Sequence, residues 1–250
     1  MRRKPPYMMG LFGISMVCGL VDAACFLALG GVFAEVMTGN LVLLAFRLGS
    51  GEDISGGSTA RYLAAVAFFA VGALLGGLML RGPSRVADHR FGFLAELALL
   101  VAATATAIVT GAGYTGWNRD VVVALLATAM GIQNALLRAH GVRDLATNVM
   151  TLTFTALVAD STLARGTNVR WLRRTCSIVT FFCGAALGAR LVRYGAHYPL
   201  ILATVVFSLA LIPLLGSSPT EPGPAAASAT ARRTSGRDAV RPATASRDPN

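Results

Sequence analysis

Six stretches of this sequence are each long and apolar enough to cross a membrane as a helix. The hydrocarbon core of a bilayer is about 30 Å thick and requires about 20 mostly apolar residues of α-helix. Charged residues make up only 14% of the chain and the mean hydropathy is +0.61, whereas soluble domains carry about 25% charged residues. We therefore predict an all-α fold, a polytopic membrane helix bundle with spans at 10–32, 60–80, 91–112, 121–137, 175–191 and 199–215.

Two further segments are partly apolar but do not qualify as spans. Residues 37–48 would rise only about 18 Å as a helix, and residues 146–163 carry many Thr, Asn and Asp side chains. Lipid offers no hydrogen-bond partner to such groups. We predict that both segments are short re-entrant or half-inserted elements. A full crossing by each segment, which would give eight spans, is the alternative.

The two short polar segments belong to an internal duplication. The sequence GLVDA at 19–23 matches GIQNA at 131–135, 112 positions later, and Met-Thr at 37–38 matches Met-Thr at 150–151. Each repeat then has a span, a short polar segment and two more spans, so the two repeats must be inverted relative to each other, as in many secondary transporters. The predicted parts are a basic N-terminus at 1–9, repeat 1 at 10–112, repeat 2 at 113–215 and a tail at 216–250.

Two pairs of glycines extend the duplication. Gly72 and Gly76 are matched by Gly184 and Gly188, again 112 positions later. Small residues spaced by four lie on one helix face and allow membrane helices to approach closely. We predict that these faces pack helices together, and that they offer a route to a homo-oligomer.

The distribution of basic residues predicts the orientation. Lys and Arg gather in short runs between the apolar segments, and the six-span arrangement places more of them on the side of the termini than the eight-span arrangement does. Basic residues favour the cytoplasmic side. We therefore predict a multi-pass protein of the cell (inner or plasma) membrane with both termini in the cytoplasm. The tail at 216–250 is rich in Pro, Ala, Ser, Thr and Arg and is predicted to be disordered.

Several functional classes have no support in the sequence. The net charge of +10 arises from the runs between spans and not from a folded basic face, so nucleic acid is not an expected partner. The four cysteines lie inside apolar segments without a CxxC pair, so neither a metal site nor a redox motif is expected. There is no catalytic triad and no phosphate loop. We predict that the protein is not an enzyme and has no cofactor.

The duplicated motifs carry a resemblance to a known family. Residues 19–23, 32–33, 37–40 and 129–135 (AMGIQNA) resemble the YoaK-like family of bacterial inner-membrane proteins. The resemblance extends over about residues 9–215. It implies about six transmembrane helices and leaves the activity open, because the family is catalogued as a domain of unknown function.

The candidate site consists of polar residues deep in apolar sequence. Asp22 lies about 18 Å into the first segment, and an ionisable residue at that depth marks a functional site by default; a structural Asp that ties helices together is the alternative. Asn134 is its counterpart in the second repeat. Gly39 is expected to break the helix, and Thr38 or Asn40 to cap the half-helix that follows. The predicted site residues are Asp22, Thr38, Gly39, Asn40, Gln133, Asn134 and Thr151.

Two functions fit these residues. The first is a small transporter or channel-like protein with a midplane polar site between the repeats. Such a site would suit a small polar or anionic solute, and proton coupling through Asp22 would fit. The second is a membrane-embedded scaffold or interaction protein in which the same residues only hold helices together.

Overall fold

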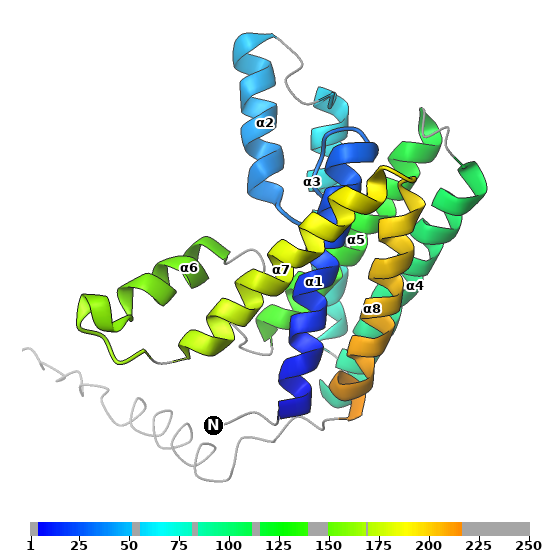
Figure 1. The fold of residues 1–250 in the computed structure, drawn as a ribbon. Helices are drawn as coiled ribbons and strands as arrows, with labels where there is room; N and C mark the ends of the chain where they lie inside the picture. Colours follow the sequence, from blue (N-terminus) through cyan, green and yellow to red (C-terminus); the bar gives the residue numbers. More distant parts are fainter. Residues whose placement is uncertain are drawn as a thin grey trace, which may run out of the picture. The chain divides into compact units, whose positions relative to one another are not determined.

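The computed structural model describes residues 5–51, 56–81, 85–111, 116–139, 150–168 and 170–216. Within these residues the chain is all-helical (Figure 1). The predicted tail, from residue 217 onward, lies outside the described residues. The helices are α1 (Pro5–Ala28), α2 (Met37–Ser50), α3 (Thr59–Met79), α4 (Arg85–Thr110), α5 (Trp117–Ala139), α6 (Met150–Ala159), the 3-10 turn η2 (Thr162–Ala164), α7 (Trp171–Val192) and α8 (His197–Gly216).

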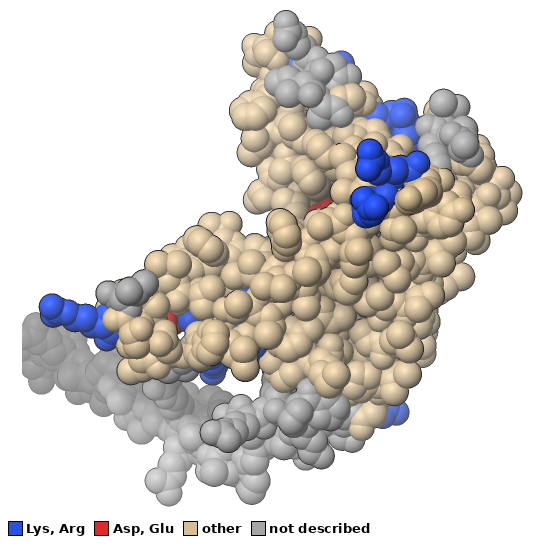
Figure 2. Space-filling model, in the orientation of Figure 1, with Lys and Arg blue, Asp and Glu red and all other residues tan. Residues whose placement is uncertain are grey.

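Six of these helices are long and apolar enough to span a membrane, as the sequence predicted. The spans are Met8–Ala28, Thr59–Met79, His89–Thr110, Trp117–Ala139, Trp171–Val192 and His197–Gly216. Large apolar side chains on them are exposed, including Val109 (86%) and Phe182 (70%). On the face in Figure 2, Lys and Arg lie mainly near the margins of a broad uncharged surface. The chain is therefore an integral, multi-pass membrane protein, because only lipid can solvate such a surface.

The first span ends earlier than predicted. The sequence is apolar to Val32, but α1 stops at Ala28. Gly30 and Gly31 follow with φ values of 102° and 70°, a left-handed conformation that is strained for residues with a Cβ. The two glycines turn the chain out of the helix, and the apolar residues 32–34 belong to the segment after the turn.

The two short polar segments form helices that lie apart from the six spans. In Figure 1, α2 and α6 both project away from the bundle of longer helices. Each packs mainly on the helix after it, α2 on α3 and α6 on α7. At the end of α6, Arg174 of α7 donates to the carbonyl of Ala156 (2.8 Å) and to Asp160 (2.7 Å). Neither short helix is long enough to count among the spans.

Glycines bring α1 against α7. A Cβ built on Gly184 would overlap the carbonyl oxygen of Met16, and one on Gly188 would lie 2.8 Å from Cβ of Ala23. The contacts advance together along both helices, so α1 and α7 run parallel. Only glycine permits this backbone approach.

The equivalent glycines bring α3 against α5 in the same way. A Cβ on Gly72 would overlap the carbonyl oxygen of Thr128, and one on Gly76 would lie 2.8 Å from Cβ of Ala135. Gly72 and Gly76 lie 112 positions before Gly184 and Gly188, whereas Thr128 and Ala135 lie 112 positions after Met16 and Ala23, so the two repeats exchange roles between the two helix pairs. The duplication seen in the sequence therefore recurs in the packing of the helices.

These contacts occupy the glycine faces from which the sequence predicted a homo-oligomer. Gly72, Gly76, Gly184 and Gly188 are all buried against helices of the same chain. Self-association through these faces would have to displace the chain's own helices.

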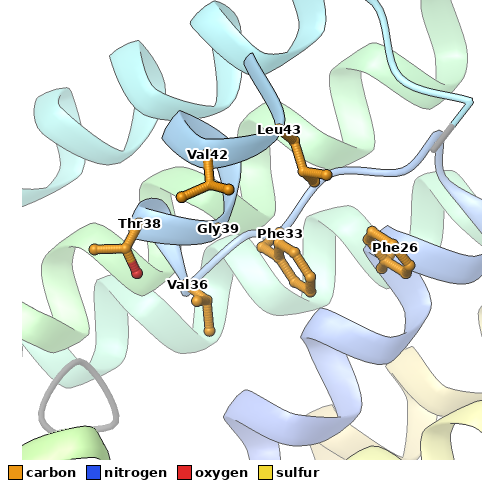
Figure 3. A pocket seen from close by; sticks show the side chains of 7 residues that line it. All are labelled: Phe26, Phe33, Val36, Thr38, Gly39, Val42 and Leu43. Carbon is orange, nitrogen blue, oxygen red and sulfur yellow. The ribbon is translucent and has the colours of Figure 1, made fainter. Parts of the chain in front are cut away.

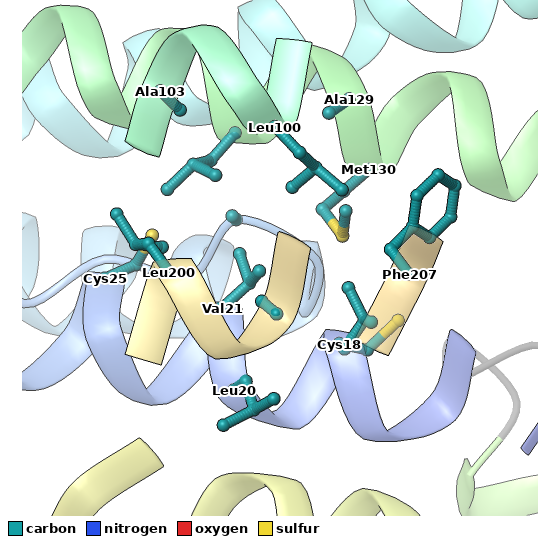
Figure 4. Packing of buried hydrophobic residues seen from close by; sticks show 14 of the residues in the cluster. Cys18, Leu20, Val21, Cys25, Leu100, Ala103, Ala129, Met130, Leu200 and Phe207 are labelled. Atoms are coloured by element: carbon teal, nitrogen blue, oxygen red, sulfur yellow. The ribbon is translucent and has the colours of Figure 1, made fainter. Parts of the chain in front are cut away.

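The remaining pairs close the bundle. α1 packs on α8 through Gly13, which lies against Ala210, and α4 packs on α5 through Gly92, which lies against Leu136. α4 and α8 meet where the hydroxyls of Thr104 and Thr204 are 2.9 Å apart. The core between these helices is apolar, and Figure 4 shows Cys18, Leu100, Met130 and Phe207 within it.

The ends of the helices can be assigned to two sides of the bundle. Arg90, near the start of α4, donates to the carbonyl of Leu215 at the end of α8 (2.9 Å), and Gly10 of α1 lies against Leu214. The start of α1 and the end of α8 are therefore on one side, which we call the terminal side (Figure 1). On the opposite side Arg61, at the start of α3, pairs with Asp120, at the start of α5 (2.9 Å).

Candidate functional site

The site is built around the turn that follows α1. After Gly30 and Gly31 the chain folds back, and the ring of Phe33 stacks on that of Phe26, one turn before the end of α1, with centroids 4.8 Å apart. Arg61 fixes the turn from the α3 side, since its Nη1 lies 3.4 Å from the carbonyl oxygen of Gly30. The segment 29–36 is thus held alongside the end of α1.

Asp22 receives the backbone of this returning segment. Its Oδ1 accepts hydrogen bonds from the backbone N–H groups of Ala34 and Glu35, both at 2.9 Å. The side chain is only 4% exposed, and it lies about 9 Å before the end of α1. The predicted deep carboxyl is therefore present, and it stabilises two N–H groups that no helix or sheet satisfies.

The carboxyl of Glu35 lies next to Asp22 and links the two repeats. Glu35 is fully buried, and its side chain makes a hydrogen bond with Asn134 of α5. Burial raises the pKa of Glu35 well above its usual value, and the neighbouring charge of Asp22 raises it further, whereas the bond to Asn134 acts in the opposite direction. Asn134 also donates to the carbonyl of Met130 (2.9 Å). Asp22, Glu35 and Asn134, which we call the carboxyl junction, thus come from both halves of the chain.

Asn40 has a different role from the predicted cap. Its Nδ2 donates to the carbonyl of Phe33 (2.7 Å) and its Oδ1 accepts from the N–H of Phe33 (2.8 Å). The residue before α2 is Val36, and no side chain caps that helix. Asn40 is fully buried, and it holds the returning segment against the first turn of α2.

Gly39 does not break the helix, contrary to the sequence prediction. α2 runs without interruption from Met37 to Ser50, and the break in the chain occurs earlier, at Gly30 and Gly31. A Cβ on Gly39 would lie 2.8 Å from the ring of Phe33. The glycine is therefore required for the close approach of this ring and not for a turn.

An open cavity of about 400 Å³ lies beside the returning segment. Figure 3 shows its lining, which is apolar apart from Thr38. Thr38 is exposed, so the predicted residues Thr38 and Gly39 border this cavity, whereas the carboxyl of Asp22 lies buried beneath the segment. The cavity is lined by Phe26, Phe33, Val36, Thr38, Gly39, Val42 and Leu43.

Gln133 adjoins the carboxyl junction on the side of α1. Its Nε2 donates to the sulfur of Cys18 (2.9 Å), and its Oε1 has no hydrogen-bond partner within the described residues. The side chain is fully buried. A buried amide oxygen without a donor is costly, so Gln133 is a second polar position that the helix packing alone does not account for.

Thr151 is not brought to this site. It lies exposed on α6, which packs on α7, and within the described residues no hydrogen bond joins it to Asp22 or Asn134. The reason is structural: the polar segment of repeat 2 forms a helix that projects from the bundle, and the residues before it, at 140–149, lie outside the described residues.

Two buried acids were missing from the predicted site. Glu35 lies three residues before Thr38 but was not among the predicted site residues. Glu96 was not among them either, although it is fully buried in α4. The signal that would have found both is an acid flanked on each side by apolar residues. In the described part of the chain no group of three or more His, Cys, Asp and Glu residues is arranged to hold a metal ion.

Comparison with known proteins gives a family and no function. No curated protein and no solved structure matches the chain. The family described as "Protein of unknown function (DUF1275)" matches residues 10–212, which is most of the chain and includes all six spans in whole or in part. The chain belongs to this family.

Proposed function

We propose that this member of the DUF1275 family is a proton-coupled transporter of a small polar or anionic solute, and that the carboxyl junction is its site. The observation that carries the proposal is the junction itself, in which two neighbouring buried carboxyl groups meet an amide from the other repeat. We also propose that the chain is related to the YoaK-like inner-membrane proteins, which its motifs resemble.

Two neighbouring buried carboxyls are suited to carry a proton. Like charges in contact disfavour the doubly ionised state, so the pair tends to hold a proton between its two members. In the protonated form the pair offers an O–H donor and Asn134 offers an amide, a combination that binds polar and anionic groups. Release of the proton would remove the O–H donor and leave a negative charge, so the pair would no longer favour an anionic group. Binding of the solute is thereby coupled to binding of the proton.

The arrangement of the repeats supports transport over a passive role. α1 starts on the terminal side of the bundle, whereas α5, its counterpart, starts on the opposite side. We take the two halves as inverted repeats, in which alternating access occurs by motion of one half against the other around a fixed site. The junction contains Asp22 and Glu35 from one half and Asn134 from the other, as such a mechanism requires.

The orientation is part of the proposal. Lys and Arg concentrate on the cytoplasmic side of membrane proteins, and the basic residues of this chain favour the terminal side. We therefore place both termini in the cytoplasm and the Arg61–Asp120 pair on the far side of the bacterial inner membrane.

A membrane scaffold is the second candidate, and Asn40 favours it. Its amide is fully engaged with the backbone of Phe33, and Oδ1 of Asp22 accepts two backbone N–H groups. Polar residues that only hold segments together behave in this way. In that case the carboxyl junction would stabilise the fold and bind no solute.

Ligand-dependent thermal stability distinguishes the two candidates. The purified protein is heated with and without inorganic phosphate, small carboxylates, amino acids and sugars. A transporter is expected to be stabilised by one class, and Asn134→Leu should lose this response, whereas Asp120→Asn, which changes an exposed carboxyl on the opposite side, should keep it. A folded protein that responds to no class, with Asn134→Leu changing only the melting temperature, would favour the scaffold.

A further inference from the structure

Glu96 is a buried acid that the carboxyl junction does not use. It lies in the span His89–Thr110 of α4 and is fully buried. Neither oxygen of its carboxyl group has a hydrogen-bond partner within the described residues. Apolar side chains lie one turn away on each side, Phe93 and Leu100. Nothing in the packing of α4 requires a carboxyl at this position.

Glu96 lies at the same depth as Gln133. α4 begins on the terminal side and α5 on the opposite side, so the two helices are antiparallel. Gly92 of α4 lies against Leu136 of α5. One turn further along α4 is Glu96, and one turn back along α5 lie Ile132 and Gln133. Two fully buried polar groups on adjacent helices therefore share one level of the bundle.

The two groups are chemically complementary once Glu96 carries a proton. The Oε1 atom of Gln133 is an acceptor without a donor among the described residues, whereas its Nε2 group donates to Cys18. A protonated Glu96 has one O–H donor and needs one acceptor. An ionised Glu96 would offer only further acceptors, so Oε1 of Gln133 would still lack a donor.

Among the described residues, no positively charged side chain lies at this level. Along α4 the basic residues closest to Glu96 are His89 and Arg90, nearer the terminal side, and Arg90 is exposed and bonded to Leu215. Within the described parts of α1, α3, α5 and α8, the other ionisable side chains lie at the helix ends, apart from those on α1. They are Arg61 and Tyr62 on α3, Arg119, Asp120 and Arg138 on α5, His197 and Tyr198 on α8, and Cys18, Asp22 and Cys25 on α1.

We propose that Glu96 is a second proton-binding site, with Gln133 as the hydrogen-bond acceptor of its protonated form, and that it passes protons between the carboxyl junction and the terminal side. The reaction is the reversible addition of one proton to the carboxylate, with no oxidation and no other bond formed. The relay rests on the proposed transport function, whereas the binding of the proton at Glu96 does not.

A proton suits this position better than a metal cation. A metal ion needs several oxygen ligands, whereas the side chains one turn from Glu96 along α4 are apolar and the described residues contain no group of three or more His, Cys, Asp and Glu residues that could hold one. A proton needs only the carboxyl. Gln133 directly precedes Asn134 in α5, and Asn134 belongs to the carboxyl junction. The level of Glu96 and Gln133 is therefore next to the carboxyl junction along α5.

Infrared difference spectroscopy tests the binding step without any solute. The full-length protein in lipid vesicles is titrated with acid and base, and the C=O stretch of protonated carboxyl groups is recorded. We expect a band that changes with pH, is absent in Glu96→Gln and shifts in frequency in Gln133→Leu. Asp120→Asn, at an exposed carboxyl, is the matched control and should leave this band unchanged.

The outcomes separate the inference from the proposed function. A folded Glu96→Gln protein with the wild-type carboxyl band would overturn the inference, as would a Glu96 band that stays constant over the whole pH range of the folded protein. If Glu96→Gln does not fold, the Gln133→Leu shift decides the question in the same way. Vesicles that show the Glu96 titration but no solute uptake would retain the proton site and refute transport.

Discussion

The substitution Gly72→Ala tests the helix packing that links the two repeats. A Cβ at this position would overlap the carbonyl oxygen of Thr128 and lie 2.8 Å from its carbonyl carbon. Ordinary contact begins at 3.4 Å, so clearing the carbon alone requires a local separation of α3 and α5 by about 0.6 Å, and clearing the nearer oxygen requires more. The obstacle is backbone, which cannot rotate away as a side chain can. The same shift would loosen the contact of Gly76 with Ala135.

The expected cost follows from overpacking. Extra bulk in a close-packed interior destabilises by about 1–3 kcal/mol, while alanine in place of glycine improves helix propensity by about 1 kcal/mol. Gly77→Ala provides the control, since a Cβ there meets nothing within 4 Å and gains the same propensity. The difference between the two variants should therefore be about 1–3 kcal/mol, with Gly72→Ala the less stable.

The assay is reversible unfolding of the purified protein in mixed micelles with increasing SDS. Gly184→Ala, at the equivalent position 112 residues later, should lose as much stability as Gly72→Ala, because its Cβ meets the backbone of Met16 in the same way. Equal stability of Gly72→Ala and Gly77→Ala would show that α3 and α5 do not approach as described. A large loss in only one of the two equivalent glycines would refute the repeated packing.

Three further predictions concern the carboxyl junction and the topology. Asp22→Ala should destabilise the protein by about 1–3 kcal/mol for each backbone N–H left without an acceptor, whereas Asp22→Asn, which keeps an acceptor oxygen, should lose less; SDS unfolding of both variants measures the difference. Because the folded pKa of Glu35 is raised, the native state binds more protons than the unfolded state at pH values between the two pKa values, so wild-type stability should fall as pH rises through that window. Glu35→Gln should show a flatter dependence of melting temperature on pH, and an identical slope would contradict the assignment. Reporters fused after Leu80 and after Leu215 should both be cytoplasmic, and an outside signal from either fusion would overturn the proposed orientation.

Much of the fold was accessible from the sequence because lipid imposes simple requirements. A helix must be about 20 apolar residues long to cross, and the six predicted segments correspond to the six spans. The duplication was visible because close helix contacts restrict the residue type, so that Gly72 and Gly184 stand at equivalent positions. The end of α1 was misplaced by four residues because apolarity does not stop at the Gly30–Gly31 turn.

The candidate site was predicted only in part. Asp22 and Asn134 were found because a polar residue in a span is conspicuous, and both belong to the carboxyl junction. The role of Gly39 was wrong, since a glycine that breaks a helix and one that admits a ring look alike in the sequence. Thr151 was grouped with Asp22 from the duplication, but symmetry in sequence does not bring a projecting helix to the same site. Glu35 was passed over because its partners Asp22 and Asn134 come from other segments, and Glu96 because its complete burial in the bundle is not visible in the sequence.

The most direct test of the central proposal is a measurement of solute and proton movement in the same vesicles. Purified protein is reconstituted with a pH-sensitive dye inside, and uptake of each solute in the panel is followed with and without an imposed pH gradient. We predict that one class enters faster when the gradient favours it, that the internal pH changes with uptake, and that Asp22→Asn abolishes both effects while remaining folded. Uptake with no proton movement, or wild-type coupling in Asp22→Asn, would contradict the account.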